Sequence, residues 1–291
     1  MSIILLKMIA LISMTIDHMG LFLFDQFFLF RIIGRISAPI FMFSSTEALK
    51  HINNKWRYII RLYFFSIICA ILQSALQIDN NFIRCLFETC VVIVVLENIK
   101  EKKYLFLWGA WQVLAYITVF YICYTMGENY ITMALIPTIF GSLFLCEGGV
   151  VFIIIGIIFY YSKNKRELIF AYIMVCIVIL FLTSTNYISL VIFYMNRITI
   201  LGISIYLGDF LELLLNTTAA IIAPMNIGKS VLYENNQWLM IIAFPFFAVY
   251  NGKYSSAAKS TILYKIEKNI FYIYYPAHIL VLHFISTQII K

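Results

Sequence analysis

The chain has 291 residues, of which 63% are hydrophobic and 12% are charged, and its formal net charge is +7. A soluble globular domain is about half apolar and about a quarter charged, so this composition excludes a soluble protein and the nucleic-acid partner that its positive charge would suggest. Apolar blocks of about 20 residues, long enough to cross a bilayer of about 30 Å, recur along the chain and predict an all-α, polytopic membrane protein. No polar stretch is long enough for a further domain, so residues 1–291 are expected to form a single integral membrane domain.

The first apolar block, Ile3–Phe24, is expected to be a retained membrane helix and contains the ionisable pair Asp17 and His18. Ionisable side chains persist in hydrocarbon when they pair, line a wet cavity or perform chemistry, and histidine is well suited to move a proton near neutral pH. Lys7 lies about three helical turns before His18 and shares a face with it, with Met14 between them. Asp17 points about 100° away from His18, so it is expected to pair with a cation on another helix. In the alternative interpretation, Asp17 forms a purely structural ion pair with an arginine, and His18 is a buried residue that only packs.

The second predicted helix carries two arginines, Arg31 and Arg35, one turn apart on one face. Gly34 permits close backbone approach between them, and Pro39 can kink the helix beyond. Arginines that face the interior need anionic partners, and Asp17 is the nearest candidate for one of them. Arg31 can also be read as an interfacial anchor, whereas Arg35 lies deeper in the helix.

Basic residues cluster where the third predicted helix begins, at Lys55, Arg57 and Arg61, shortly after Glu47 and Lys50. A basic mouth on the cytoplasmic side can receive a phosphorylated ligand, because cationic side chains bind phosphate through charge-assisted hydrogen bonds. The alternative reading is the ordinary excess of positive charge in cytoplasmic loops.

The distribution of charge among the loops predicts the topology. By the positive-inside rule the basic loops face the cytoplasm, which also places the N-terminus there. These loops are Lys50–Arg57, Lys100–Lys103, Lys163–Arg166 and Lys253–Lys268. Lys100–Lys103 and Lys163–Arg166 can both face the cytoplasm only if residues 130–162 cross the membrane an odd number of times. We expect a broken or re-entrant piece in this segment, around Pro137 and Gly148–Gly149. This count gives roughly 10–11 spans.

The last predicted helix contains Pro276 followed by His278. A proline at membrane depth leaves a backbone acceptor without its helical donor, which suits the wall of a polar cavity. Arg84 and Glu88 are spaced to pair along one helix face, a structural arrangement. The six cysteines lie in apolar segments without CxxC spacing and are read as buried free thiols, so no metal is expected.

Five motifs follow one another along the chain: Met14-Thr-Ile-Asp17-His18-Met-Gly20, Arg31-Ile-Ile-Gly34-Arg35-Ile-Ser-Ala-Pro39, Tyr58-Ile-Ile-Arg61-Leu62, Tyr250-Asn251-Gly252 and Phe271-Tyr-Ile-Tyr-Tyr275-Pro276-Ala-His278. Taken in order, these motifs resemble the TraX family, membrane proteins named for the acetylase of conjugative F-type pilin. More remotely, a first-helix histidine and an arginine that opens the third helix are similar to membrane acyltransferases that O-acetylate polysaccharides.

The resemblance implies an acetyltransferase of the bacterial inner membrane that moves an acetyl group from cytosolic acetyl-CoA to an amine or hydroxyl acceptor. The acceptor is expected to be a peptide or pilin N-terminus or a glycan, and the setting a conjugation system. His18 is then the general base, Arg35 or His278 stabilises the oxyanion, and Asp17 holds Arg35 or otherwise balances charge. The phosphates of the donor are expected at Arg61, Arg57 and Lys55.

Two other classes of function are compatible with these residues. One is a proton-coupled transporter or flippase, in which His18, Asp17 and Glu47 form a proton path. The other is a non-catalytic membrane subunit of a conjugation or secretion system. Proton-coupled uptake by vesicles that lack an acyl donor would favour the transporter, and normal function after replacement of both His18 and Arg35 would favour the non-catalytic subunit.

Overall fold

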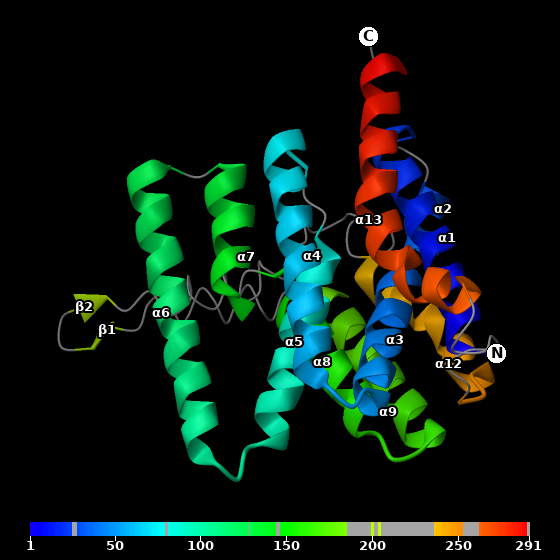
Figure 1. The fold of residues 1–291 in the computed structure, drawn as a ribbon, viewed down its shortest axis with the longest axis horizontal. Helices are drawn as coiled ribbons and strands as arrows, with labels where there is room; N and C mark the ends of the chain where they lie inside the picture. Colours follow the sequence, from blue (N-terminus) through cyan, green and yellow to red (C-terminus); the bar gives the residue numbers. More distant parts are fainter. Residues whose placement is uncertain are drawn as a thin grey trace.

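The computed structural model describes residues 1–24, 28–78, 81–127, 129–143, 146–184, 199–200, 203–204, 236–252 and 262–289. Within these ranges the protein is an all-α helical bundle, as predicted, apart from one pair of two-residue antiparallel strands, β1 (Thr199–Ile200) and β2 (Ile203–Ser204) (Figure 1). The polar residues between 185 and 229 lie almost wholly outside the described residues, so the spans expected there stay predictions.

The helices follow the apolar blocks of the sequence. The first part of the chain forms α1 (Ile3–Phe22), α2 (Phe28–Gly34), α3 (Ser37–His51), α4 (Lys55–Leu76), α5 (Phe82–Glu97) and α6 (Lys102–Met126). The second part forms η1 (Ile131–Leu135), α7 (Ile136–Phe140), α8 (Gly149–Tyr161), α9 (Lys165–Ser184), η3 (Asn236–Ala243), α12 (Phe244–Val249) and α13 (Ile262–Ile289). The side chains of Asn54 and Asn81 accept backbone N–H groups at the starts of α4 and α5, as helix caps do.

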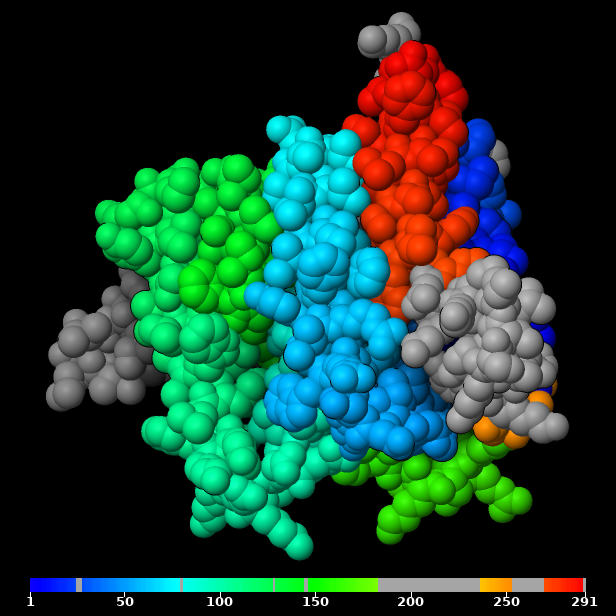
Figure 2. Space-filling view, viewed as in Figure 1, coloured from blue at the N-terminus to red at the C-terminus, as the bar shows by residue number. Residues whose placement is uncertain are grey.

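Five segments of the described chain are long and apolar enough to cross a membrane, which supports a polytopic membrane protein. They are Ile3–Phe22, Phe28–His51, Lys55–Leu76, Lys102–Met126 and Ile270–Ile289, and shorter apolar helices accompany them. Only Gln112, Ala115 and Val119 of α6 are buried, and most of its other side chains form an outer, largely apolar surface. α6 lies at the edge of the bundle (Figure 2). Such a face suits contact with lipid, because lipid tails are as apolar as the side chains.

The basic loops gather at one end of the bundle, the lower end in Figure 1. The amino group of Met1 donates to Val249 O at 2.8 Å, and Lys50 Nζ donates to Phe159 O at 2.8 Å. Lys165 Nζ donates to the carbonyl of Tyr250 at the same end. The N-terminus and three of the four basic loops are therefore together, as the positive-inside prediction requires; most of the fourth loop lies outside the described residues.

The predicted interruption in residues 130–162 is present. The helical path of η1 and α7 ends at Gly141, which has a left-handed φ of 62°, and α8 begins only at Gly149. Figure 1 shows α7 in the upper half of the bundle and α8 in the lower half, so the two pieces together make one traverse. Pro137 lies in the first turn of α7, where proline is tolerated, so the break follows Gly141 and not the proline.

Candidate functional site

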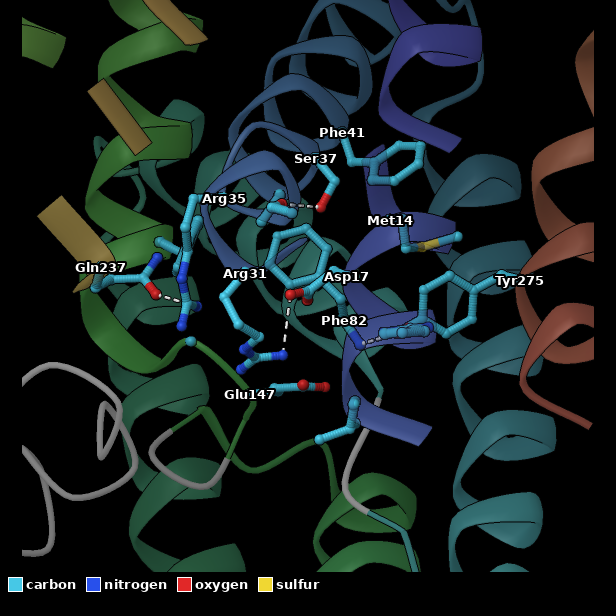
Figure 3. Close-up of a pocket in the computed structure, with 16 residues that line it drawn as sticks. Met14, Asp17, Arg31, Arg35, Ser37, Phe41, Phe82, Glu147, Gln237 and Tyr275 are labelled. Carbon is cyan, nitrogen blue, oxygen red and sulfur yellow. Dashed lines mark hydrogen bonds and ion pairs between the residues drawn. The ribbon is translucent and has the colours of Figure 1, made fainter. Parts of the chain in front are cut away.

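A polar cavity of ≈ 280 Å³ lies where α1, α2, α3, η3 and α13 meet the loop that precedes α8 (Figure 3). We call it the His18 cavity. Its polar and charged walls include Asp17, His18, Arg31, Arg35, Glu147 and Gln237. Three distant parts of the sequence, residues 17–35, Glu147 and Gln237, therefore contribute ionisable or polar groups to one space inside an apolar bundle. This placement is expected of a functional site in a membrane protein.

His18 and His278 form a buried pair at this cavity. His18 Nδ1 lies 2.6 Å from His278 Nε2, and the two rings are nearly coplanar, with an interplanar angle of 3°. On its other side, His278 Nδ1 lies 2.9 Å from the carbonyl oxygen of Tyr274. The sequence analysis placed both histidines in the membrane, and the structure brings them into direct contact across 260 residues.

The carbonyl of Tyr274 determines which ring nitrogens carry protons. A carbonyl oxygen can only accept, so His278 Nδ1 must be the N–H donor, and in the neutral ring His278 Nε2 is then an acceptor. His18 Nδ1 must in turn donate its N–H to that acceptor. The lone pair of a neutral His18 is therefore on Nε2, the nitrogen that a general base would use.

A second layer of contacts fixes the position of His278. The Tyr274 ring stacks on the His278 ring at a centroid distance of 5.2 Å, and its hydroxyl lies 2.7 Å from Thr15 Oγ1 on α1. The neighbouring Tyr275 hydroxyl accepts the Phe82 N–H at 2.9 Å, which ties α13 to the start of α5. His278 is thus positioned from three helices, as a residue that orients another side chain needs to be.

Asp17 forms an ion pair with Arg31, whose Nη1 lies 2.9 Å from Asp17 Oδ1 (Figure 3). The expected cation on another helix is therefore Arg31 on α2. A Cβ at Gly34 would lie 2.3 Å from Asp17 Cβ, so only glycine allows α1 and α2 to approach this closely.

The suggested pairing of Asp17 with Arg35 is wrong. Arg35 Nε donates to Asn236 Oδ1 at 2.8 Å and Arg35 Nη1 donates to Gln237 Oε1 at 2.6 Å. Both partners are uncharged amides on η3, so they hold the guanidinium in place without neutralising it. Arg35 lines the cavity, stays positively charged and has further N–H groups besides the two that are bonded. Such a guanidinium can stabilise negative charge that develops in the cavity.

Glu147 is a site residue that was not predicted from the sequence. It lies in the interruption before α8, lines the His18 cavity, and accepts the backbone N–H of Asn81 through Oε2. The signal that could have identified it is an acidic residue beside Gly148 and Gly149 in an otherwise apolar stretch. Gln237 was missed for a simpler reason, because a glutamine near a helix end has no distinctive pattern.

Lys7 does not line the His18 cavity, although the helical angle placed both residues on one face. Lys7 instead lines a small cavity of ≈ 20 Å³ with Ser44 and Tyr58, nearer the end that carries the basic loops. Phe41 lines both cavities and separates them. Lys7 and His18 therefore line two different cavities, although they lie on one face of α1.

The three residues expected to bind phosphate do not form one cluster. Lys55 Nζ is 2.5 Å from Glu97 Oε1 and also donates to the Tyr160 hydroxyl at 2.8 Å, so it faces α5 and α8. Arg61 faces α13, with its guanidinium carbon 5.8 Å from the centre of the Tyr272 ring, and Arg57 is exposed.

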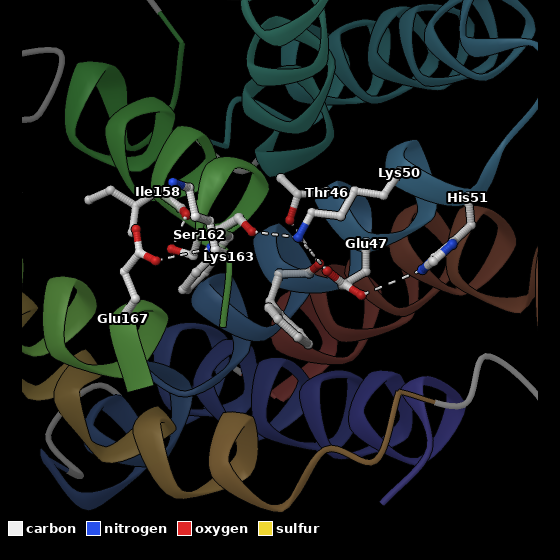
Figure 4. A network of polar contacts seen from close by, with 10 residues as sticks. Thr46, Glu47, Lys50, His51, Ile158, Ser162, Lys163 and Glu167 are labelled. Carbon is white, nitrogen blue, oxygen red and sulfur yellow. Dashed lines mark hydrogen bonds and ion pairs between the residues drawn. The ribbon is translucent and has the colours of Figure 1, made fainter. Parts of the chain in front are cut away.

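At the same end Glu47 is engaged in a local network. It pairs with Lys50 at 2.7 Å and with His51 at 3.8 Å, and the same lysine reaches the end of α8 (Figure 4). This network joins α3 to α8 near the surface and lies apart from the residues that line the His18 cavity. It therefore supplies no continuous path from Glu47 to Asp17 among the residues that the structure describes.

No group of three His, Cys, Asp or Glu side chains suited to hold a metal occurs among the described residues. All six cysteines are free thiols, and five of them are buried.

The family model described as "TraX protein" matches residues 2–148, just over half of the chain, and so includes His18, Arg35 and Glu147 but not His278. An uncharacterized protein, RP591, from Rickettsia prowazekii is 33% identical over 122 residues, which are 42% of this chain and 48% of the relative.

A second relative is the probable fimbrial assembly protein FimC, serogroup H1, from Dichelobacter nodosus, which is 34% identical over 99 residues, 31% of this chain and 41% of the relative. The chain thus matches less than half the length of both relatives, and no solved structure matches it. The family match also continues through the middle of the chain up to residue 148, which the motifs had not covered. On this match the chain belongs to the TraX family.

Proposed function

We propose that the protein is a membrane-embedded acetyltransferase that transfers an acetyl group from acetyl-CoA to an amine or hydroxyl acceptor in the His18 cavity. The observation that carries the proposal is the buried hydrogen bond between His18 and His278. It defines the basic nitrogen of His18 and orients its ring, which are the two requirements for a general base. A purely structural histidine needs neither a second histidine nor a cavity.

The reaction assigns a role to each side chain. His18 Nε2 takes the proton of the acceptor N–H or O–H while the acceptor atom forms a bond to the thioester carbonyl carbon. The guanidinium of Arg35, held by Asn236 and Gln237, stabilises the negative charge that develops on the carbonyl oxygen. The C–S bond then breaks, and protonated His18 returns the proton to the leaving sulfur. His278 stays behind the base as a positioning residue and stabilises its cationic form.

Asp17 and Arg31 contribute a second, internally neutral pair to the same cavity. Asp17 is adjacent to His18 in sequence, and Arg31 lies four residues before Arg35, which follows the end of α2. The ion pair between α1 and α2 therefore helps to fix the separation of the base and the oxyanion donor. Asp17 therefore supports the site through Arg31 and not through Arg35.

The donor is proposed to enter from the end that carries the basic loops. Arg57 and Arg61 are the available cations on α4, whereas Lys55 is already bonded to Glu97 and Tyr160. Arg57 and Arg61, one turn apart, are therefore the better candidates for the phosphates. This arrangement requires that end to be cytoplasmic, with the protein in the bacterial inner membrane.

The acceptor is proposed to be the N-terminus of a pilin-like peptide or a glycan hydroxyl. The name of the Dichelobacter nodosus relative, a probable fimbrial assembly protein, supports the peptide, and membership of the TraX family supports a setting in pilus assembly or conjugation. Glu147 provides a carboxylate in the cavity that can receive an amine acceptor.

The test is acetyl-CoA turnover by the purified protein in detergent, with a peptide and glycan pool as acceptor. His18→Ala is expected to lower turnover about 10²–10⁴-fold, the usual contribution of a general base. The matched control is His283→Ala, on α13 but outside the cavity, where the ring contacts Phe22. Equal turnover by the wild type and a folded His18→Ala variant would remove the proposal.

A further inference from the structure

A second cavity, of ≈ 310 Å³, lies between α4, α5, α6 and α7 and shares no lining residue with the His18 cavity. We call it the aromatic groove. α4, α6 and α7 lie side by side on the face shown in Figure 2, and lining residues such as Trp56 (58% exposed) and Trp111 (46% exposed) reach the outer surface of the bundle. Six aromatic residues line it: Trp56, Tyr63, Phe87, Trp108, Trp111 and Phe140.

The backbone carbonyls at the break after α7 are paired with side-chain donors. A break at membrane depth leaves backbone carbonyls that need donors, because lipid offers none. Four consecutive carbonyls here each accept a side-chain hydrogen bond at 2.7–2.9 Å. The pairs are Tyr63 Oη to Ile139 O, Trp111 Nε1 to Phe140 O, Gln112 Nε2 to Gly141 O, and Arg84 Nη2 to Ser142 O.

Several buried side-chain atoms near the break have no hydrogen-bond partner among the described residues: Arg84 Nε, Ser142 Oγ, Trp108 Nε1 and Glu88 Oε1. Of these, Glu88 provides the carboxylate on the wall of the groove, and its side chain is 1% exposed. The expected pairing with Arg84, one turn away on α5, does not form: the guanidinium is instead bonded to Ser142 O, at the break. The indole N–H of Trp108, also on the groove wall, is likewise buried without a partner in the described part of the chain.

The Glu88 carboxylate and the aromatic rings of the groove together favour one class of ligand, an organic cation. Aromatic faces attract organic cations, and the attraction is larger when the cation is desolvated. A buried carboxylate gains most from a cation that can also donate hydrogen bonds. The other walls, such as Ile60 and Ile139, are apolar and suit an alkyl chain. Arg84 offsets part of the charge of Glu88, so the rings must supply the rest of the attraction.

We propose that the aromatic groove binds an alkylammonium amphiphile that enters from the bilayer. The ammonium group lies against Glu88 and the aromatic rings, and the alkyl chain follows Ile60 and Ile139 toward the lipid. The site is independent of acetyl transfer, because none of its residues lines the His18 cavity.

The test uses tryptophan fluorescence of the full-length protein in maltoside micelles. Three of the four tryptophans of the chain line the groove, so their emission reports its occupancy. Decylamine, protonated at neutral pH, is titrated against 1-decanol, which has the same chain and no charge. The wild type is expected to bind decylammonium at least tenfold more tightly than decanol. Equal affinities for the two amphiphiles overturn the proposal without any variant.

Substitutions then locate the site. Glu88→Gln keeps the size of the side chain and is expected to lower decylammonium affinity at least tenfold while leaving decanol unchanged. Glu97→Gln, at the end of the same helix and outside the groove, is the matched control and is expected to bind as the wild type does. His18→Ala is also expected to bind normally, which separates this site from the proposed reaction. An unchanged affinity in a folded Glu88→Gln variant refutes the assignment.

Discussion

Replacement of His278 tests whether one histidine positions the other. His278→Leu removes the acceptor for His18 Nδ1–H, which lies 2.6 Å from His278 Nε2, while it keeps an apolar side chain in the buried space. A hydrogen bond to a group that becomes charged contributes about 1.5–3 kcal/mol, and each 1.4 kcal/mol or so is a factor of ten in rate. His278→Leu is therefore expected to lower kcat about 10- to 150-fold, less than the loss of His18 itself.

His278→Gln is the conservative counterpart. A glutamine can place Oε1 near the position of His278 Nε2 and accept the same proton, so it is expected to recover most of the activity that leucine loses. A residue that served only to fill space would show the opposite order, because leucine replaces the apolar volume and glutamine does not.

The assay is single-turnover acetyl transfer with labelled acetyl-CoA, with folding checked by size-exclusion profile and Tm. The double variant His18→Ala, His278→Leu is expected to be no slower than His18→Ala alone, because a positioning residue has nothing to position once the base is absent. Multiplicative losses in the double variant, or full activity in His278→Leu, would refute the orientation argument.

Two further predictions concern the helix contact and the donor. Gly34→Ala is expected to lower the free energy of unfolding by about 1–3 kcal/mol, because its Cβ would lie 2.3 Å from Asp17 Cβ, whereas Gly109→Ala, with no atom within 4 Å of the added Cβ, should leave Tm unchanged or raised. Equal Tm values for the two variants would show that α1 and α2 do not meet as closely as described. Arg61→Ala is expected to raise the KM for acetyl-CoA about tenfold through the loss of one charge-assisted contact, whereas Lys55→Ala, whose amine is bonded to Glu97, should alter KM little. Equal increases in KM for Arg61→Ala and Lys55→Ala would show that Lys55 also binds the phosphates.

The sequence predicts what depends on periodicity and charge along one segment. Loop charge required an odd number of crossings in residues 130–162, and Pro137 with Gly148–Gly149 suggested an interrupted span there. The interruption is present, but it begins at Gly141. The position of Asp17 relative to His18 followed from the helical angle alone. Both arguments use distances within a few turns, over which helix geometry determines the outcome.

Partners across the bundle were beyond such reasoning. Arg35 is bonded to side chains 201 and 202 residues away, and these are neutral amides, so neither proximity in sequence nor opposite charge pointed to them. Lys7 and His18 do share a face, but a helical angle does not reveal that Phe41 from α3 closes the space between them. Sequence identified which polar residues lie in the membrane, and only packing showed which of them meet.

The interruption after α7 explains both cavities in the same physical terms. Once the helix stops at Gly141, four carbonyls require donors, and side chains from α4, α5 and α6 supply them. Because Arg84 is committed to one of these carbonyls, Glu88 loses its natural partner and is left on the wall of the aromatic groove. At the other end of the same loop, Glu147 is carried into the His18 cavity and bonded to Asn81 N–H. The break thus brings Glu147 to the His18 cavity and engages the arginine that could otherwise pair with Glu88. A continuous helix would do neither, because its carbonyls need no outside donors.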